Sequence, residues 1–298
     1  MKATIAKAQP RRVRANSFFY RARGDSPFAL LVINLMLVLA CVVAVYPAVR
    51  VFSISLGPFN QSLIDPFTIV PASATAANYI QLIAKKGFVL WLCNSLAITV
   101  SVALIGLALS ATGAYAFSRW KFPGRRPGLI FLMATQMIPA GMVLIPVYLM
   151  LAKLGMINHF NGLALAYTVT AVPFSIWILK GYYDTVPLDL EEAAMIDGCS
   201  RLQAFWRIVL PLSTPALAIV FLFNFMQAWS EFPVAYRIIT NKNLYTWTLG
   251  LKALQGQFQT EWGMYAAASV LITIPVLLLF LYSAKWLISG LTLGSVKG

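Results

Sequence analysis

The chain has 298 residues, of which 60% are apolar and 11% charged, and 23 basic against 9 acidic side chains give a formal net charge of +14. Soluble domains carry about 25% charged residues, so too little charge is present to cover a soluble globule. The composition excludes a disordered chain and a coiled coil, and three cysteines cannot form a disulfide framework. It indicates an all-α integral membrane protein.

Charge-free apolar runs predict six transmembrane helices. A span needs about 20 residues, because the hydrocarbon core is about 30 Å thick and a helix rises about 1.5 Å per residue. The six runs cover residues 26–49, 87–118, 127–152, 154–179, 208–230 and 262–284. A seventh charge-free run, residues 66–84, contains two prolines and many small polar residues, so we expect it to be an external loop.

The distribution of lysine and arginine sets the expected orientation, because these residues are retained on the cytoplasmic side. With the N-terminus inside, 16 basic residues fall in inside segments and 7 in outside segments. Both termini are therefore predicted to be cytoplasmic, with residues 1–26 as a basic N-terminal segment and 287–298 as a C-terminal tail. Anionic lipid headgroups account for the positive charge without nucleic acid, although the N-terminal segment is also basic enough to bind a polyanion.

Motifs for catalysis are missing from the sequence. It contains no glycine-rich phosphate loop ending in Gly-Lys-Ser/Thr, no HExxH and no GxSxG. The single histidine, His159, lies near the outer end of the fourth predicted span. We therefore expect a chain that is not an enzyme and holds neither a metal nor a cofactor.

One inside segment, between the fourth and fifth spans, holds most of the acidic residues. Five of the nine fall within 14 residues: Asp184, Asp189, Glu191, Glu192 and Asp197. Pro187 suits the first turn of a helix, and Gly198 can take the left-handed conformation that ends it. Ser200 and Gln203 then have the spacing of a capping box. The segment is predicted to form two short helices separated at Gly198.

The first of these two helices has one narrow face. Leu190, Ala193, Ala194 and Asp197 follow the helical i, i+3, i+4, i+7 spacing, and two alanines allow another backbone to approach closely. An alternative is a helix lying on the bilayer, but five carboxylates disfavour contact with an anionic surface. The pattern favours a docking element for a cytoplasmic protein.

The same segment resembles the EAA loop of permease subunits from binding-protein-dependent ABC importers. The matching residues, with the spacing of that motif, are Glu192, Ala193, Ala194, Gly198, Ile208, Leu210 and Pro211. Residues 114–125, 181–194 and 290–298 are similar to carbohydrate importers, most closely to the G-type subunits of maltose/maltodextrin systems. The resemblance covers nearly the whole chain after about residue 20.

The resemblance implies a six-helix permease domain over residues 27–298, with the EAA loop at 181–211, in the plasma (inner) membrane of a bacterium or archaeon. Its implied partners are a second, F-type permease, two ATP-binding subunits that hold ATP and Mg, and an extracytoplasmic sugar-binding protein. ATPase coupling is carried over to Glu192, Ala193, Ala194, Asp197, Gly198, Ile208, Leu210 and Pro211. A further contact with the ATPase pair is carried over to the tail residues Gly294, Ser295, Val296, Lys297 and Gly298.

Polar residues inside spans are candidates for the translocation path, namely Gln136, Asn224, Gln227 and Glu231. For Asn224 and Gln227 the alternative is hydrogen bonding between helices. Gly106, Ser110 and Ala114 form a small-residue stripe for close packing, against either a partner permease or the chain's own helices.

The outer segment 236–262 is mixed polar and aromatic, with Gly250 and Gly256 as expected hinges. By resemblance it contacts the docked binding protein, and its composition suits sugar hydroxyls and rings at Gln255, Gln257, Phe258 and Gln259. The alternative is an ordinary loop packed on the spans.

Two other classes of protein are compatible with a polytopic chain. A secondary transporter is expected to show an internal repeat and charged or broken midplane helices, and an intramembrane enzyme needs a nucleophile and base or metal ligands within its spans. The sequence shows no obvious repeat and no carboxylate near a span centre. A sugar importer permease is therefore the main hypothesis, and a secondary transporter of a small solute is the alternative.

Overall fold

The computed structural model describes residues 26–58, 69–256 and 260–293, and these residues form helices and connecting turns, with one isolated β-bridge between Gln255 and Thr260. Backbone polar groups at lipid depth find no water, and a helix satisfies them internally. Four helices are long and apolar enough to cross a membrane as continuous elements. These are α1 (Pro27–Ser55), α3 (Phe88–Arg119), α6 (Phe160–Tyr183) and α13 (Trp262–Leu293).

The other two predicted spans are each divided into helices that meet at a sharp bend. Residues 127–152 fall in α4 (Arg125–Thr135) and α5 (Ala140–Lys153), which are bent by 102° where Pro139 caps α5. The second break is a bend of 79° at Ser213. It separates α10 (Thr214–Ser230) from a run of α8 (Arg201–Ala204), a π-helical turn (Phe205–Val209) and α9 (Leu210–Leu212). Proline lacks a backbone N–H and disfavours a helical residue before it. Within the described residues, the helices that are long and apolar enough to cross a membrane number four, or up to six if each bent pair crosses once.

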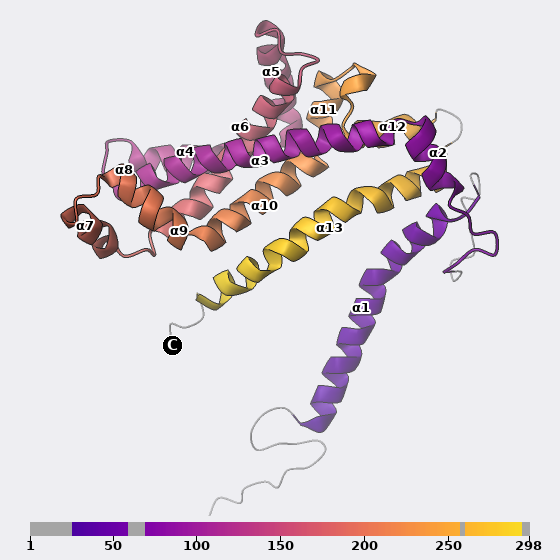
Figure 1. Ribbon diagram of the computed structural model, residues 1–298, viewed down its shortest axis with the longest axis horizontal. Coiled ribbons are helices and arrows are strands. Elements are labelled where there is room, and N and C mark those ends of the chain that lie inside the picture. The colour runs from indigo at the N-terminus through magenta and orange to yellow at the C-terminus, as the bar shows by residue number, and fades with distance from the viewer. Residues whose placement is uncertain (1–25, 59–68, 257–259, 294–298) are drawn as a thin grey trace, which may run out of the picture.

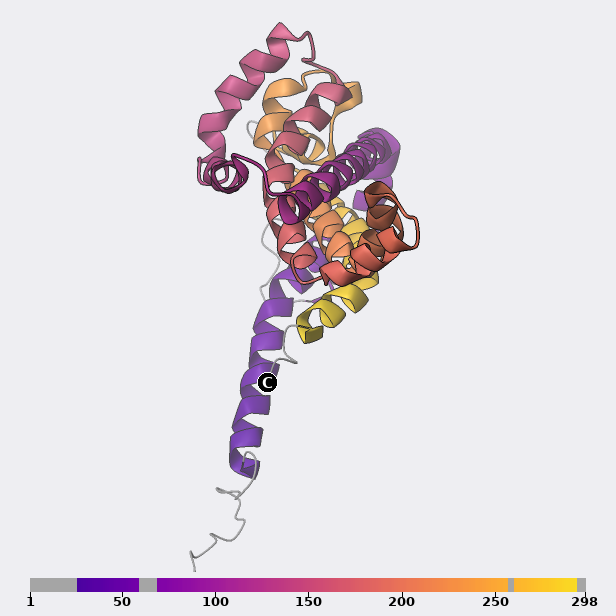
Figure 2. The same ribbon diagram turned by 90° about the vertical axis from the view of Figure 1, so that its left-hand side faces the viewer.

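The core of the bundle is made by α3, α6 and α10, with α13 packed on α10 (Figure 1). Gly106, Ser110 and Ala114 are buried on α3, and a Cβ added to Gly106 would lie 2.9 Å from Nδ2 of Asn224 on α10. The small-residue stripe therefore packs against the chain's own helices, which is the second of the two partners considered from the sequence. Figure 2, which looks onto the end carrying α7 (Leu188–Ile196), shows α1 extending away from the other helices.

The opposite end of the bundle carries α2 (Ala77–Lys85), α11 (Pro233–Ile238), a 3₁₀ turn (Lys242–Leu244) and α12 (Trp247–Leu254). Residues 66–84 were expected to be an external loop, but residues 77–84 lie in the helix α2. Asn78 anchors this helix, because its Nδ2 donates to the carbonyls of Ser55 (2.8 Å) and Gly57 (2.7 Å). Gly250 is not a hinge either. It lies within α12, where a Cβ would be 2.1 Å from Cε3 of Trp91. Glycine is needed there for the close approach of α12 to α3.

Candidate functional site

The acidic segment forms the two helices that its sequence predicts. Helix α7 follows Pro187, which lies at the N-cap rather than inside the first turn, and it ends before Gly198, whose φ is 93°. Ser200 Oγ accepts from the Gln203 N–H (3.3 Å) and Gln203 Oε1 accepts from the Ser200 N–H (2.7 Å), which completes the capping box. These local devices fix where α7 ends and α8 begins.

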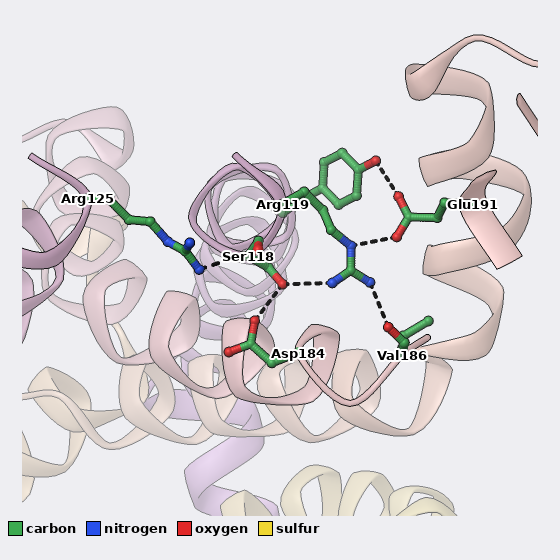
Figure 3. A network of polar contacts seen from close by, with 7 residues as sticks. Ser118, Arg119, Arg125, Asp184, Val186 and Glu191 are labelled. Atoms are coloured by element: carbon green, nitrogen blue, oxygen red, sulfur yellow. Dashed lines mark hydrogen bonds and ion pairs between the residues drawn. The ribbon is translucent and has the colours of Figure 1, made fainter. Parts of the chain in front are cut away.

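Glu191 attaches α7 to the end of α3 (Figure 3). Its Oε1 accepts a hydrogen bond from Arg119 Nε at 2.5 Å, and its Oε2 accepts one from the Tyr115 hydroxyl at 2.6 Å. Arg119 Nη2 also donates to the carbonyl of Val186 at 3.0 Å. The Arg119 and Glu191 side chains are only 5% and 7% exposed. We call Tyr115, Arg119 and Glu191 the Glu191 network, in which a buried charge pair has both carboxylate oxygens hydrogen-bonded.

A second set of polar contacts connects α3 with the end of α6. Ser118 Oγ donates to Asp184 Oδ1 at 2.7 Å and accepts from Arg119 Nη1 at 3.1 Å, while Lys180 forms an ion pair with Asp184. An open pocket of about 550 Å³ lies beside these contacts and is lined by residues 118, 119, 125 and 184–189. Through Ser118 and Arg119 the ends of α3, α6 and α7 form one connected polar unit.

Asp184 makes the stability of this polar unit depend on pH. Burial alone would raise its pKa, but hydrogen bonds from Lys180 and Ser118 and the charges of Lys180 and Arg125 outweigh burial and lower the pKa below 3.8. The ionised Asp184 carboxylate therefore contributes its full stabilisation of the folded protein above pH 3.8. This contribution is lost as the pH falls through the lower pKa of Asp184 in the folded state. We expect Asp184→Asn to lower the Tm of the purified protein at about pH 7 and to converge on the wild type in acid. The exposed Asp189→Asn is the matched control, and a Tm difference for Asp184→Asn that persists unchanged in acid would contradict the assignment.

The residues predicted for coupling extend from α7 to α9 and differ in exposure. Glu192, Ala193, Asp197, Gly198 and Pro211 are exposed, Ile208 and Leu210 are half-buried, and Ala194 is buried at 8% exposure. The expectation that both alanines share a free face was therefore wrong, because Ala194 packs inside the chain. The exposed side chains of α7, α8 and the π-helical turn that follows instead include Glu192 and the large apolar residues Ile196 (87%), Leu202 (65%) and Trp206 (60%). Exposed apolar groups of this kind mark an interaction surface.

The sequence interpretation missed Tyr115, Arg119 and Glu191. The available signal was Arg119, the first basic residue after an otherwise charge-free span, together with an excess of acids in the following inside segment. That signal does not distinguish Glu191 from Glu192, because the two adjacent acids differ only in the side of the helix on which they lie.

Of the four residues proposed for the translocation path, only Gln136 and Gln227 are brought together. Asn224 is buried at 2% exposure and accepts from Ser175 Oγ at 2.7 Å, so it connects α10 to α6, which agrees with the helix-bonding alternative. Glu231 accepts from the N–H groups of Val234 (2.9 Å) and Ala235 (3.2 Å) at the start of α11. Gln136 and Gln227 are exposed and converge on Thr170 of α6, where their Nε2 atoms donate to its carbonyl (3.1 Å) and its Oγ1 (3.3 Å).

The outer segment and the tail are only partly described. Gln255 is exposed and its Oε1 accepts from Lys252 Nζ at 3.0 Å. The other proposed contact residues of this segment, Gln257, Phe258 and Gln259, lie outside the described residues. The proposed tail contacts, Gly294, Ser295, Val296, Lys297 and Gly298, also lie outside them.

Comparison with known proteins relates the chain to bacterial uptake systems. Diacetylchitobiose uptake system permease protein DasC of Streptomyces coelicolor is 34% identical over 89% of this chain and 96% of its own length. Maltose/maltodextrin transport system permease protein MalG of Salmonella typhimurium is 40% identical over 70% of this chain and 72% of its own length, and MalG of Escherichia coli is 39% identical over the same shares.

Solved structures agree at the level of the fold. A bacterial ABC transporter involved in the import of the acidic polysaccharide alginate aligns with a TM-score of 0.76 at 23% identity, covering 87% of this chain and 96% of that chain. Residues 103–292 match the family described as binding-protein-dependent transport system inner membrane component. This chain belongs to that family, which supplies the membrane permease component of ABC importers.

Proposed function

We propose that the chain is a permease subunit of an ATP-driven, binding-protein-dependent importer of a neutral di- or oligosaccharide, and that it forms half of the translocation path. The relatives that transport maltose, maltodextrin and diacetylchitobiose support the substrate class. The observation that carries the proposal is α7, whose buried side is fixed to α3 by Glu191 while its free side exposes Glu192 and Ile196.

The proposed assembly contains a second permease, two ATP-binding subunits that hold ATP and Mg²⁺, and an extracytoplasmic sugar-binding protein. A solved alginate transporter in complex with a pentasaccharide-bound periplasmic protein, related in fold, supports the last of these partners. We place α7 and both termini in the cytoplasm of a bacterial or archaeal cell. Basic residues around α7, among them Arg119, Arg125, Lys180, Arg201 and Arg207, support that orientation.

In this assembly an ATP-binding subunit docks on the free side of α7 and α8. A cation of that subunit pairs with Glu192, and its apolar surface covers Ile196, Leu202 and Trp206. When the ATP-binding subunits change state, the displacement reaches α3 through the Glu191 network and α6 through Asp184. A chain without ATPase motifs thereby uses the energy of ATP through a partner with two discrete states.

The test is sugar uptake into vesicles that hold the complete importer, with the binding protein and ATP supplied. We expect Glu192→Ala to lower uptake at least about tenfold, which corresponds to about 1.4 kcal/mol of lost coupling. Lys153→Ala is the control, because Lys153 is an exposed charged residue at the end of α5, outside both the coupling surface and the segment proposed to contact the binding protein. Unchanged uptake for Glu192→Ala would refute the coupling surface, and uptake that persists without ATP-binding subunits would favour the secondary transporter.

A further inference from the structure

Two exposed amide side chains converge on the middle of α6. Gln227 lies in α10, whose hydrophobic run defines a predicted span, and Gln136 caps α4 at the break before α5. Both reach Thr170, near the centre of α6. Thr170 satisfies the two Nε2 groups, but neither Oε1 accepts a hydrogen bond from the described residues. A polar atom that faces hydrocarbon without a partner costs several kcal/mol, so these oxygens favour a water-filled path or a protein surface. This side of the bundle is therefore not a lipid-facing surface.

Aromatic side chains continue the same face toward the α7 end of α6. Phe174 and Trp177 lie one and two turns beyond Thr170 and are 40% and 54% exposed, and Phe223, one turn from Gln227 on α10, is 49% exposed. The rings of Phe174 and Trp177 are stacked with centroids 6.5 Å apart, and Phe174 meets Phe223 edge to face at 5.9 Å. We call this face the amide–aromatic strip, made of Gln136, Thr170, Phe174, Trp177, Phe223 and Gln227.

The composition of the strip fits one class of ligand. Each glutamine donates through Nε2 to Thr170, and neither Oε1 accepts a hydrogen bond from the described residues, so both oxygens remain available to hydroxyl donors. Exposed rings offer flat apolar surfaces of the size of a sugar ring. Binding sites for small molecules combine aromatic lining with a few placed polar groups in this way. The strip carries no charged side chain, which suits a neutral solute and not an acidic one.

We propose that the amide–aromatic strip contacts the transported sugar directly, with the glutamine oxygens accepting from sugar hydroxyls and the rings of Phe174 and Phe223 stacking on pyranose faces. The inference rests on the proposed function and goes beyond it, because it assigns sugar contacts to this subunit itself. It also gives the sugar a path along α6 and α10, from the amides in the outer half to the aromatic rings nearer α7.

The experiment uses the complete importer in vesicles, with Cys41, Cys93 and Cys199 replaced by serine. Single cysteines are introduced by Gln227→Cys and Phe174→Cys, and Phe131→Cys on α4 is the control because Phe131 is 68% exposed and is not among the residues of the strip. Maltose and diacetylchitobiose are the probe sugars, and wild-type uptake selects the one that is transported. A charged, water-soluble thiol reagent is then applied to the vanadate-arrested complex with and without that sugar.

We expect the reagent to modify positions 227 and 174, and the sugar to slow modification at least about fivefold, which is about 1 kcal/mol of protection. Position 131 should not react in either condition. Equal rates with and without sugar would overturn the proposal, and so would failure of 227 and 174 to react, because the strip would then face the second permease or lipid.

A second measurement uses other substitutions, for the case in which the cysteine variants do not assemble. Gln227→Ala and Phe174→Leu should slow uptake about tenfold while binding-protein-stimulated ATP hydrolysis is retained, because these residues lie outside the coupling surface. Loss of uptake and ATP hydrolysis together would indicate a structural role and would overturn sugar contact. Normal wild-type uptake with an unprotected strip refutes only this inference, whereas wild-type uptake that needs no ATP-binding subunits would refute the proposed function as well.

Discussion

Replacing Glu191 with alanine is expected to destabilise the protein by about 3–5 kcal/mol, because it leaves the Arg119 guanidinium buried without its carboxylate. Arg119 is 5% exposed, so water cannot replace the lost partner. The variant should also release α7 from α3, so that ATP hydrolysis by the partner subunits no longer drives uptake. The measurements are the Tm of the purified protein and ATP-dependent uptake by the complete importer.

The control for Glu191→Ala is Asp189→Ala, which removes an exposed acid from the same helix and should leave the Tm nearly unchanged. A second control replaces both charges, as Arg119→Met with Glu191→Leu. Apolar groups in place of a buried ion pair are often neutral or stabilising, so this double variant should recover most of the Tm. The Glu191 network would be refuted as an anchor if Glu191→Ala and Asp189→Ala behaved alike.

Replacing Gly250 with alanine is expected to destabilise the outer end of the bundle by about 3 kcal/mol, the upper part of the usual range for overpacking. The added Cβ would lie 2.1 Å from Cε3 and 2.2 Å from Cδ2 of Trp91, and Trp91 is itself only 8% exposed. Either the indole or α12 must therefore move. We expect a lower Tm and weaker binding-protein-dependent uptake, since α12 and the adjacent segment lie at the proposed docking end.

Gly181→Ala is the matched control, because Gly181 is also helical and an added Cβ would have no neighbour within 4 Å. Alanine is the better helix former, so this control should be neutral or slightly stabilising. Combining Gly250→Ala with Trp91→Leu should recover part of the Tm by removing the clashing ring. A Tm for Gly250→Ala equal to that of Gly181→Ala would show that α12 does not need the close approach.

Local sequence signals predicted the α7 and α8 pair well because the devices involved act over three or four residues. Gly198 adopts the left-handed backbone and Ser200 with Gln203 forms the capping box, as their types and spacing indicate. Proline was a poorer guide to breaks. Pro139 and Pro211 lie at or next to the breaks, but Pro47, Pro146, Pro173 and Pro275 lie inside continuous helices. Neighbouring helices can satisfy the freed carbonyl, so a proline alone does not determine whether a span breaks.

The sequence by itself determined that this chain is helical, because runs of apolar residues without charge can only enter a bilayer with their backbone hydrogen bonds closed internally. Which side chains face inward was decided by the tertiary structure. Glu191 and Glu192 are chemically identical, and only Arg119 and Tyr115 on α3 draw one of them into the interior. In the same way Asn224 meets Ser175 and Gly106, whereas Gln227, three residues later, remains exposed at Thr170. Packing between helices that are distant in sequence sets these orientations, and the periodicity of one helix carries no information about its neighbours.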